Sequence, residues 1–146
     1  MLEIREITAL ETFPVRHPVL RNDKPLKSCA FDGDDLRSTK HFGLYENEEL
    51  AGVISVFKVQ NSAFANDMQF QIRGMAVLET FRKRGFGEQL VRHVETFVSE
   101  KSGKLIWFNA RQNAVRFYKS LGYEVCGDSF DIPDVGIHLR MFKNMT

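Results

Sequence analysis

The chain has 146 residues, enough for one domain with its own hydrophobic core, and we expect a single domain over residues 1–146. Its composition, 43% hydrophobic and 27% charged, is that of an ordinary globular protein. A net charge of +1 gives no general attraction to nucleic acid or to a membrane surface. Any basic binding site must therefore be local.

The sequence contains no stretch typical of a targeting or membrane segment. Charged residues interrupt the N-terminal region where a signal peptide would have its apolar core, and no apolar run approaches the roughly 18 residues that a membrane helix needs. The two cysteines, Cys29 and Cys126, lack the spacing of a metal site. We therefore expect a cytoplasmic protein with reduced thiols, no bound metal and no membrane partner.

The first part of the chain predicts strands around a segment of weaker pattern. Alternating apolar and charged residues predict a strand over residues 2–7. Residues 8–36 hold three of the four prolines, and we expect short helices joined by loops there because proline interrupts helices. Two strands are predicted at residues 39–45 and 50–60, joined by a polar hairpin turn at residues 46–49.

The middle of the chain predicts a bulged strand followed by a helix. A period of two over residues 68–73 is typical of a strand, and it breaks at Gly74, which indicates a bulge or a close backbone approach. Apolar residues then recur at helical spacing and predict a helix of about four turns over residues 86–100, which Gly103 ends.

The last third predicts further strands and a second helix. Residues 105–108 form a short apolar run typical of a buried strand, and residues 110–121 have the spacing of a helix that Gly122 ends. The last two strands are expected at residues 123–126 and 137–142, on either side of a loop at residues 130–136. The order of elements predicts a mixed α/β sheet with helices packed on it.

A basic turn with two glycines precedes the first long helix. Arg82, Lys83 and Arg84 stand beside Gly85 and Gly87. A helix N-terminus has unpaired N–H groups and a partial positive charge, and glycines let the backbone approach a ligand closely. The turn therefore predicts an anion site that fits a pyrophosphate. A solvated basic cap on a surface helix and a nucleic-acid patch are the alternatives.

Two stretches resemble the motifs of a known family. Residues 82–87, Arg-Lys-Arg-Gly-Phe-Gly, resemble the acetyl-CoA signature of the GNAT N-acetyltransferase superfamily, which follows a bulged strand. Residues 109–123 resemble the family's second motif, Asn-x-x-Ala-x-x-Phe-Tyr-x-x-x-Gly-Phe, with Tyr123 in place of the final Phe. The C-terminal residues are similar to those of a bacterial GNAT subgroup of unassigned acceptor.

This resemblance implies the GNAT fold, a mixed sheet of six to seven strands with a bulged, splayed central strand and about four helices. It implies that acetyl-CoA lies in the gap beside the bulged strand and pairs with its backbone. The cofactor contacts implied by the two motifs are Met75, Ala76, Val77, Arg82, Lys83, Arg84, Gly85, Phe86, Gly87, Glu88, Asn113, Arg116 and Tyr118.

The resemblance also implies a role for Tyr118. It matches the tyrosine that protonates the departing CoA thiolate in many members of the family, and a phenol that titrates near pH 10 is a donor at neutral pH. Asn113 is matched to an asparagine that contacts the pantetheine arm, and Arg116 is a candidate for the CoA phosphates. The alternatives are a core tyrosine, a locally bonded asparagine and a solvated arginine.

The acceptor side is indicated less sharply. A lysine-like amine with a pKa of about 10.4 is neutral in only about one part in 10³ at pH 7, so a base would help. Residues 69–75 contain no carboxylate, although some members of the family carry a glutamate there, so the candidate bases are His138 and His41. We expect the acceptor wall within residues 14–36, and the candidates for holding an acidic group are Arg21, Arg73 and Arg111.

The sequence therefore predicts an acetyl-CoA-dependent N-acetyltransferase. The acetyl group is expected to move to a primary amine of a small molecule or peptide, by direct attack in a ternary complex without a covalent enzyme intermediate. A homodimer is frequent in the family and is possible here, and no nucleic-acid partner is expected. A non-catalytic CoA-binding or regulatory domain on the same scaffold and a nucleic-acid-binding module are the alternatives.

Overall fold

A seven-stranded sheet forms the centre of the computed structural model, which describes residues 1–145. Its strands are β1 (Leu2–Ile7), β2 (Lys40–Glu46), β3 (Glu49–Phe57), β4 (Gln69–Val77), β5 (Leu105–Arg111), β6 (Glu124–Ile132) and β7 (Gly136–Asn144). Their order across the sheet is β1-β2-β3-β4-β5-β7-β6. β4 and β5 are parallel, and the other neighbours are antiparallel. The expected mixed sheet is confirmed.

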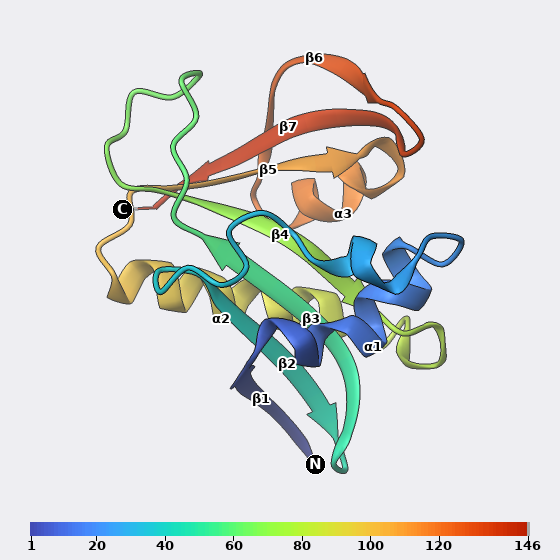
Figure 1. The fold of residues 1–146 in the computed structure, drawn as a ribbon. Coiled ribbons are helices and arrows are strands. Elements are labelled where there is room, and N and C mark those ends of the chain that lie inside the picture. The colour runs from blue at the N-terminus through green and yellow to red at the C-terminus, as the bar shows by residue number, and fades with distance from the viewer. Residues whose placement is uncertain (146) are drawn as a thin grey trace.

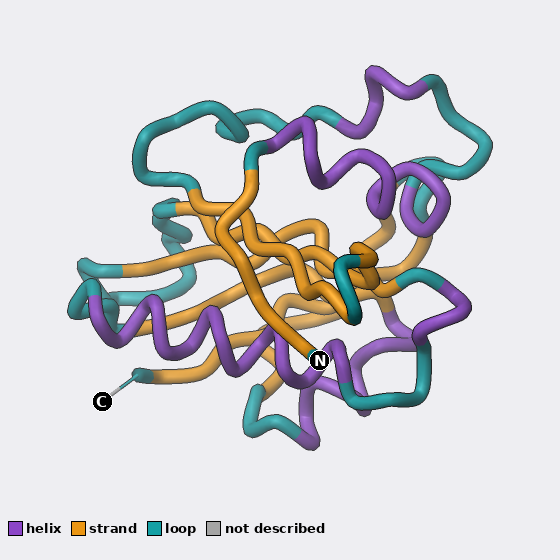
Figure 2. Tube along the Cα trace, turned by 90° about the horizontal axis from the view of Figure 1, so that it is seen from below, coloured by secondary structure: helices purple, strands orange, loops and turns teal. Residues whose placement is uncertain are grey.

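Helices cover both faces of this sheet. α1 (Ala9–Leu20) packs on β3 and β4 from one side, and α2 (Phe86–Glu100) packs on β2, β3 and β4 from the other (Figures 1 and 2). The other helical segments are α3 (Val115–Ser120) and three 3₁₀ turns, η1 (Leu26–Cys29), η2 (Glu79–Phe81) and η3 (Gln112–Ala114). Residues 1–145 thus form three α-helices and three short turns, where about four helices were expected.

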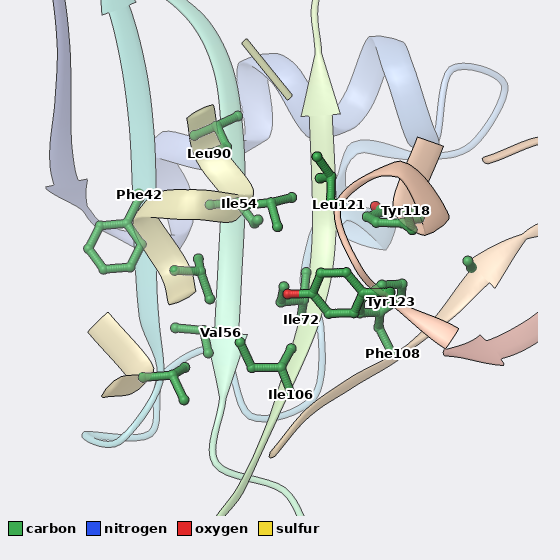
Figure 3. Close-up of a cluster of buried hydrophobic side chains, with 14 of the residues drawn as sticks. Phe42, Ile54, Val56, Ile72, Leu90, Ile106, Phe108, Tyr118, Leu121 and Tyr123 are labelled. Carbon is green, nitrogen blue, oxygen red and sulfur yellow. The ribbon is translucent and has the colours of Figure 1, made fainter. Parts of the chain in front are cut away.

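The main core lies between α2 and the sheet. Phe86, Leu90, Val91, Val94 and Val98 are the buried positions of α2, and they form the apolar face that the sequence predicts. Figure 3 shows this cluster together with side chains from the strands and from α3. None of the helices within residues 1–145 has the length and apolar composition to cross a bilayer.

α1 is one helix where short helices and loops were expected. Pro14 and Pro18 each remove one N–H from its hydrogen-bond ladder, but both are exposed, so water can reach the carbonyls left without a partner. The helix begins with a capping box, in which Thr8 and Glu11 exchange hydrogen bonds of 2.8 and 3.2 Å. Capping and burial of the opposite face outweigh the two missing bonds.

The end of the chain departs from its local pattern because of pairing with β7. β5 continues to Arg111, not to residue 108, since it pairs with β7 along its whole length. The helix expected over residues 110–121 is therefore reduced to η3 and α3. β6 likewise continues through part of the loop expected at residues 130–136, because it resumes pairing with β7 after an irregularity between Cys126 and Phe130.

β4 is bulged on one edge and parted from β5 on the other. Against β3, its register shifts because one extra residue is inserted between Arg73 and Ala76. Gly74 in this insertion has a φ of +66°, the left-handed conformation that such a bulge requires. Pairing with β5 covers residues 69–71 and 105–107, after which the strands diverge (Figure 1). The expected bulged, splayed central strand is confirmed.

The position of α2 on the sheet gives a first prediction. Leu90 is fully buried, so Leu90→Ala removes packed methyl groups and should lower the free energy of unfolding by about 2–5 kcal/mol. The matched control is Gln89→Ala, an exposed position on the same helix, which should change it by less than about 0.5 kcal/mol. Equal losses in urea unfolding would contradict this placement of the helix.

Candidate active site

A cavity of about 380 Å³ opens where β4 and β5 part. Gly74 and Met75 of the β4 bulge form one side, and Asn109 and Arg111 at the end of β5 form the other. The end of α1, η3 with Tyr118 of α3, and the hairpin of β6 and β7 complete the wall. The bulge and the splay therefore produce a cavity bounded by backbone from two strands.

Tyr118 lines this cavity from α3. Its ring packs against Phe108, with centroids 4.4 Å apart, and against Phe117 at 5.0 Å, so that 7% of the residue remains exposed (Figure 3). Within residues 1–145 its hydroxyl has no hydrogen-bond partner, yet it is not sealed from solvent. Burial raises the pKa of Tyr118 to about 12. The phenol is thus a neutral donor over the whole physiological range.

The short helix α3 is fixed at its C-terminus. Gly122, at a φ of +98°, ends it as the sequence predicts, and the N–H of Tyr123 donates to the carbonyl of Tyr118 at 3.1 Å. Arg92 of α2 and Lys143 of β7 both donate to the carbonyl of Leu121, at 3.2 and 3.1 Å. These bonds attach α3 to α2 and to the sheet, and they hold the Tyr118 ring at the cavity.

The two candidate bases lie in different places. His138 lines the cavity, and its Nδ1 donates to the carbonyl of Gly136 at 2.8 Å, so in the neutral ring the lone pair is on Nε2. His41 lies outside the cavity, where its Nδ1 contacts Ser55 Oγ at 2.6 Å and its Nε2 contacts the carbonyl of Asp34 at 3.0 Å. Both nitrogens of His41 are therefore occupied in a structural network.

The basic turn before α2 presents free backbone donors. Within the part of the chain that the structure describes, the N–H groups of residues 83–88 have no hydrogen-bond acceptor, whereas the N–H of Gln89 donates to Gly85 at 3.1 Å. Lys83 and Gly85 have φ values of +66° and +79°, which curl the chain into the helix. A Cβ at Gly87 would lie 3.6 Å from Met75, so this turn adjoins the β4 bulge. The arrangement can bind an anion.

The cationic side chains of this turn are partly engaged already. Arg82 Nε donates to the carbonyl of Val77 at 3.1 Å, and Arg84 forms an ion pair with Glu46 at 2.7 Å. Lys83 is exposed. The backbone N–H groups and the Lys83 ammonium are therefore the free donors of the turn.

The other predicted cofactor residues differ in what they offer. Asn113 lines the cavity. Ala76 and Phe86 are buried in the core, so they present backbone alone to the gap. Glu88 and Arg116 are exposed and lie outside the cavity lining.

The match of Asn113 to the family motif needs a correction. Asn-x-x-Ala spacing, counted back from Ala114, places the motif's asparagine at position 111, where this chain has Arg111. Asn113 therefore does not occupy the motif's asparagine position. It stays a candidate for contacting the cofactor because it lines the cavity. Arg111 lines the same cavity at the end of β5, in register with His138 on β7.

Sequence analysis missed a buried group beside the cavity. Arg16 is fully buried and donates to both oxygens of Asp34, at 2.8 and 3.1 Å. Burial raises the pKa of Asp34, but bonds from Arg16 and the Phe31 N–H outweigh it and hold that pKa below its usual range. Phe31, which lines the cavity, lies against the Arg16 guanidinium with its centroid 3.9 Å away. The proline-rich segment gave no local signal for these contacts.

Comparisons with known proteins agree with this geometry. The sequence profile of the acetyltransferase (GNAT) family matches residues 2–123. The Bacillus subtilis (strain 168) protein named Uncharacterized N-acetyltransferase YitI is 30% identical over 145 residues, which cover 99% of this chain and 97% of that protein. Among solved structures, an aminoglycoside 6'-N-acetyltransferase complexed with coenzyme A superposes with a TM-score of 0.77 at 14% identity, covering 99% of this chain and 97% of that one.

A second solved structure, Escherichia coli ElaA, superposes with a TM-score of 0.75 at 18% identity, covering 98% of this chain and 99% of that one. Parted parallel strands lie beside a helix N-terminus with free N–H groups, an arrangement that fits an extended ligand carrying a phosphate group. The chain belongs to the acetyltransferase (GNAT) family. It is an N-acetyltransferase whose acceptor the family does not specify.

The burial of Tyr118 gives a second prediction, on its titration. Because burial disfavours the phenolate, the folded protein should ionise Tyr118 near pH 12, against about 10 in the unfolded chain. The stability that this residue contributes is complete below pH 10 and falls by about 1.4 kcal/mol per pH unit between 10 and 12.

The measurement is the tyrosinate absorbance of the protein minus that of Tyr118→Phe, recorded while circular dichroism shows the native fold. The difference in absorbance should increase with pH along a titration curve whose midpoint lies near pH 12. A midpoint near 10 would mean that the phenol is solvated.

Proposed function

We propose that this protein transfers the acetyl group of acetyl-CoA directly to a primary amine, inside the cavity where β4 and β5 part. The single observation that supports this most is the end of pairing after residues 71 and 107, which leaves one edge of the β4 bulge unpaired beside Tyr118. An extended thioester arm can add to such an edge as a further strand.

The residues present fit acetyl-CoA along the whole gap. Its diphosphate would bind the free N–H groups of residues 83–88 at the start of α2, with Lys83 adding charge. The pantetheine arm would pair with the backbone of Met75 and Val77 and contact Asn113. A backbone N–H near Val77 would donate to the thioester oxygen as negative charge develops on it.

The chemistry follows from the groups around the thioester. The acceptor nitrogen attacks the acetyl carbonyl carbon, a C–N bond forms, and the C–S bond breaks. Tyr118 gives its phenolic proton to the departing sulfur, and the phenolate recovers a proton from solvent, which receives the one lost by the amine, so no net proton is consumed. The raised pKa of Tyr118 ensures that the phenol is protonated at neutral pH before the transfer begins. Neither free cysteine lines the cavity, which suits direct attack better than a covalent intermediate.

His138 is the proposed base for the acceptor amine. Donation from its Nδ1 to the carbonyl of Gly136 leaves Nε2 as the acceptor in the neutral ring. Within residues 1–145 this Nε2 has no protein partner and is not sealed from solvent. It can therefore take the amine proton directly or through water, and pass it on after transfer.

The proposal extends to the setting of the enzyme. The acceptor proposed at this level is a primary amine of a small molecule or peptide. Two free thiols and use of acetyl-CoA fit a cytoplasmic location. The homodimer remains a prediction of the family resemblance.

Tyr118→Phe tests the acid. It should lower kcat on the order of 100-fold, since it removes the donor to the sulfur, while the affinity for acetyl-CoA stays within about twofold. Release of the CoA thiol over a panel of amines gives kcat, and calorimetry gives the affinity. Tyr45→Phe, a tyrosine outside the cavity, is the matched control and should leave kcat unchanged. A kcat that barely moves in Tyr118→Phe would remove the acid from the mechanism.

Gly87→Asp tests the diphosphate site. The substitution adds bulk that meets Phe117, at 3.3 Å from the new Cβ, and a negative charge among the free N–H groups. Binding of coenzyme A should weaken at least about 100-fold, because the new carboxylate and the diphosphate carry like charges at close range. Thr96→Asp, exposed on the same helix, carries the same charge as a control and should bind normally. Unchanged affinity in a folded Gly87→Asp protein would place the phosphates elsewhere.

A further inference from the structure

The cavity wall carries an unbalanced positive charge. Arg21 from the end of α1, Arg73 from β4 and Arg111 from β5 all line it, together with His138. Its lining includes no aspartate or glutamate. Three arginines therefore line one small cavity without a carboxylate in the wall to neutralise them.

The hydrogen-bond partners of Arg21 and Arg73 are carbonyl groups. Arg21 Nη1 donates to the carbonyl of Leu20 at 3.0 Å, and Arg73 Nη1 makes a long bond of 3.5 Å to the carbonyl of Asp32. Within residues 1–145, neither of them nor Arg111 has a carboxylate oxygen within 4 Å. A guanidinium has five donors, so most of theirs remain available.

The nearest buried carboxylate is committed elsewhere. Both oxygens of Asp34 accept from Arg16, and Oδ2 also accepts from the N–H of Phe31 at 2.8 Å. This network fixes Phe31, and its ring then lies beside Arg73 at 4.8 Å and Arg21 at 5.4 Å from the guanidinium carbons. Both guanidinium groups thus lie near one phenyl ring.

Arg73 is also half-buried, which raises the cost of its unpaired charge. Burial lowers the pKa of Arg73, and the neighbouring charges of Asp34 and Arg16 act on it in opposite directions. The guanidinium still remains protonated, as arginine always does in proteins. A cation kept in this setting gains more from an incoming anion than an exposed one would.

The phosphates of acetyl-CoA are not that anion in the proposed pose. A Cβ at Gly87, in the first turn of α2, would approach Met75, whereas one at Gly74 would lie 2.8 Å from Phe31. The bulge thus separates the α2 end from the arginine end, and the thioester between them carries no charge. The anion must come with the acceptor.

We propose that the acceptor is a small amine that also carries a carboxylate, a molecule of the amino-acid class, and that Arg21 and Arg73 bind this carboxylate with Arg111 beside them. The inference rests on the proposed function and adds the substrate class to it. A cavity of about 380 Å³, shared with the thioester arm, suits a small acceptor. A polycationic amine would be repelled by the three guanidinium groups.

The experiment measures binding to the protein saturated with coenzyme A, so it does not depend on turnover. The probes are common amino acids, β-alanine and 4-aminobutyrate, each paired with its carboxamide, which keeps the amine and removes the negative charge. At least one acid should bind about tenfold more tightly than its amide in calorimetry, as a charge-assisted hydrogen bond requires. Arg73→Gln and Arg21→Gln should each weaken acid binding about 10- to 100-fold and leave amide binding unchanged.

Two further variants sharpen this test. Arg37→Gln removes an exposed arginine outside the cavity and should change nothing. Arg73→Lys keeps the charge but loses the planar pair of donors, so its acid binding should fall between the wild-type and Arg73→Gln values. Thermal unfolding checks that each variant is folded. If Arg73→Gln does not fold, the test rests on Arg21→Gln.

Each result decides between the inference and the function. The inference is overturned if no acid binds, if the amides bind as well, or if the glutamine variants bind acids normally. Turnover of amines without a carboxylate, with those same results, would leave the acetyltransferase proposal intact. Arginine-dependent binding of acids without any release of CoA thiol from acetyl-CoA would support the anion site and count against the transfer reaction.

Discussion

The conformation of Gly74 is the constraint on which the rest of the site depends. Its φ of +66° accommodates the extra residue of the bulge, where β4 turns away from β5. Because Gly74 has no Cβ, Phe31 has space to lie against the bulge; a methyl group there would come within 2.8 Å of its ring. Gly74 therefore allows both the gap between β4 and β5 and the position of Phe31 in the cavity wall. A side chain at this position would strain the bulge and displace the phenyl ring near which the arginines lie.

The proposed binding site, which consists of the cavity and the adjoining turn before α2, differs in charge along its length. At the start of α2, free N–H groups and the helix dipole provide partial positive charge for an anion. At the other end, Arg21 and Arg73 provide full charges. Between them Tyr118 lies among aromatic rings, where burial keeps its proton in place. A neutral thioester suits this middle region, because both ends of the site favour negative charge and the aromatic centre disfavours any charged group.

The sequence predicted correctly those elements that are determined by residues close together in the chain. The α2 stripe, the stop at Gly122 and the bulge at Gly74 each depend on a few neighbouring residues, and the family motifs fall on them. It did not predict what depends on distant partners. The β5–β7 ladder extends β5 into a segment with helical spacing, and Arg16 meets Asp34 across 18 positions of a proline-rich stretch. Likewise, His41 and His138 look equivalent in sequence, and only the fold separates them.

The Arg16–Asp34 pair is better explained by geometry than by stability. Burying two charges costs about as much as their attraction returns, so packed apolar residues would hold α1 on the sheet equally well. Apolar residues would not bond the Phe31 N–H, the carbonyl of Cys29 and Ser55 Oγ, as this pair does. Those bonds fix residues 29–34 against the bulge, and hence the distance between Phe31 and the two arginines of the cavity. The buried pair therefore acts as a positioning element. It does not contact the proposed acceptor, but through Phe31 it fixes the arginines that bind the acceptor's carboxylate.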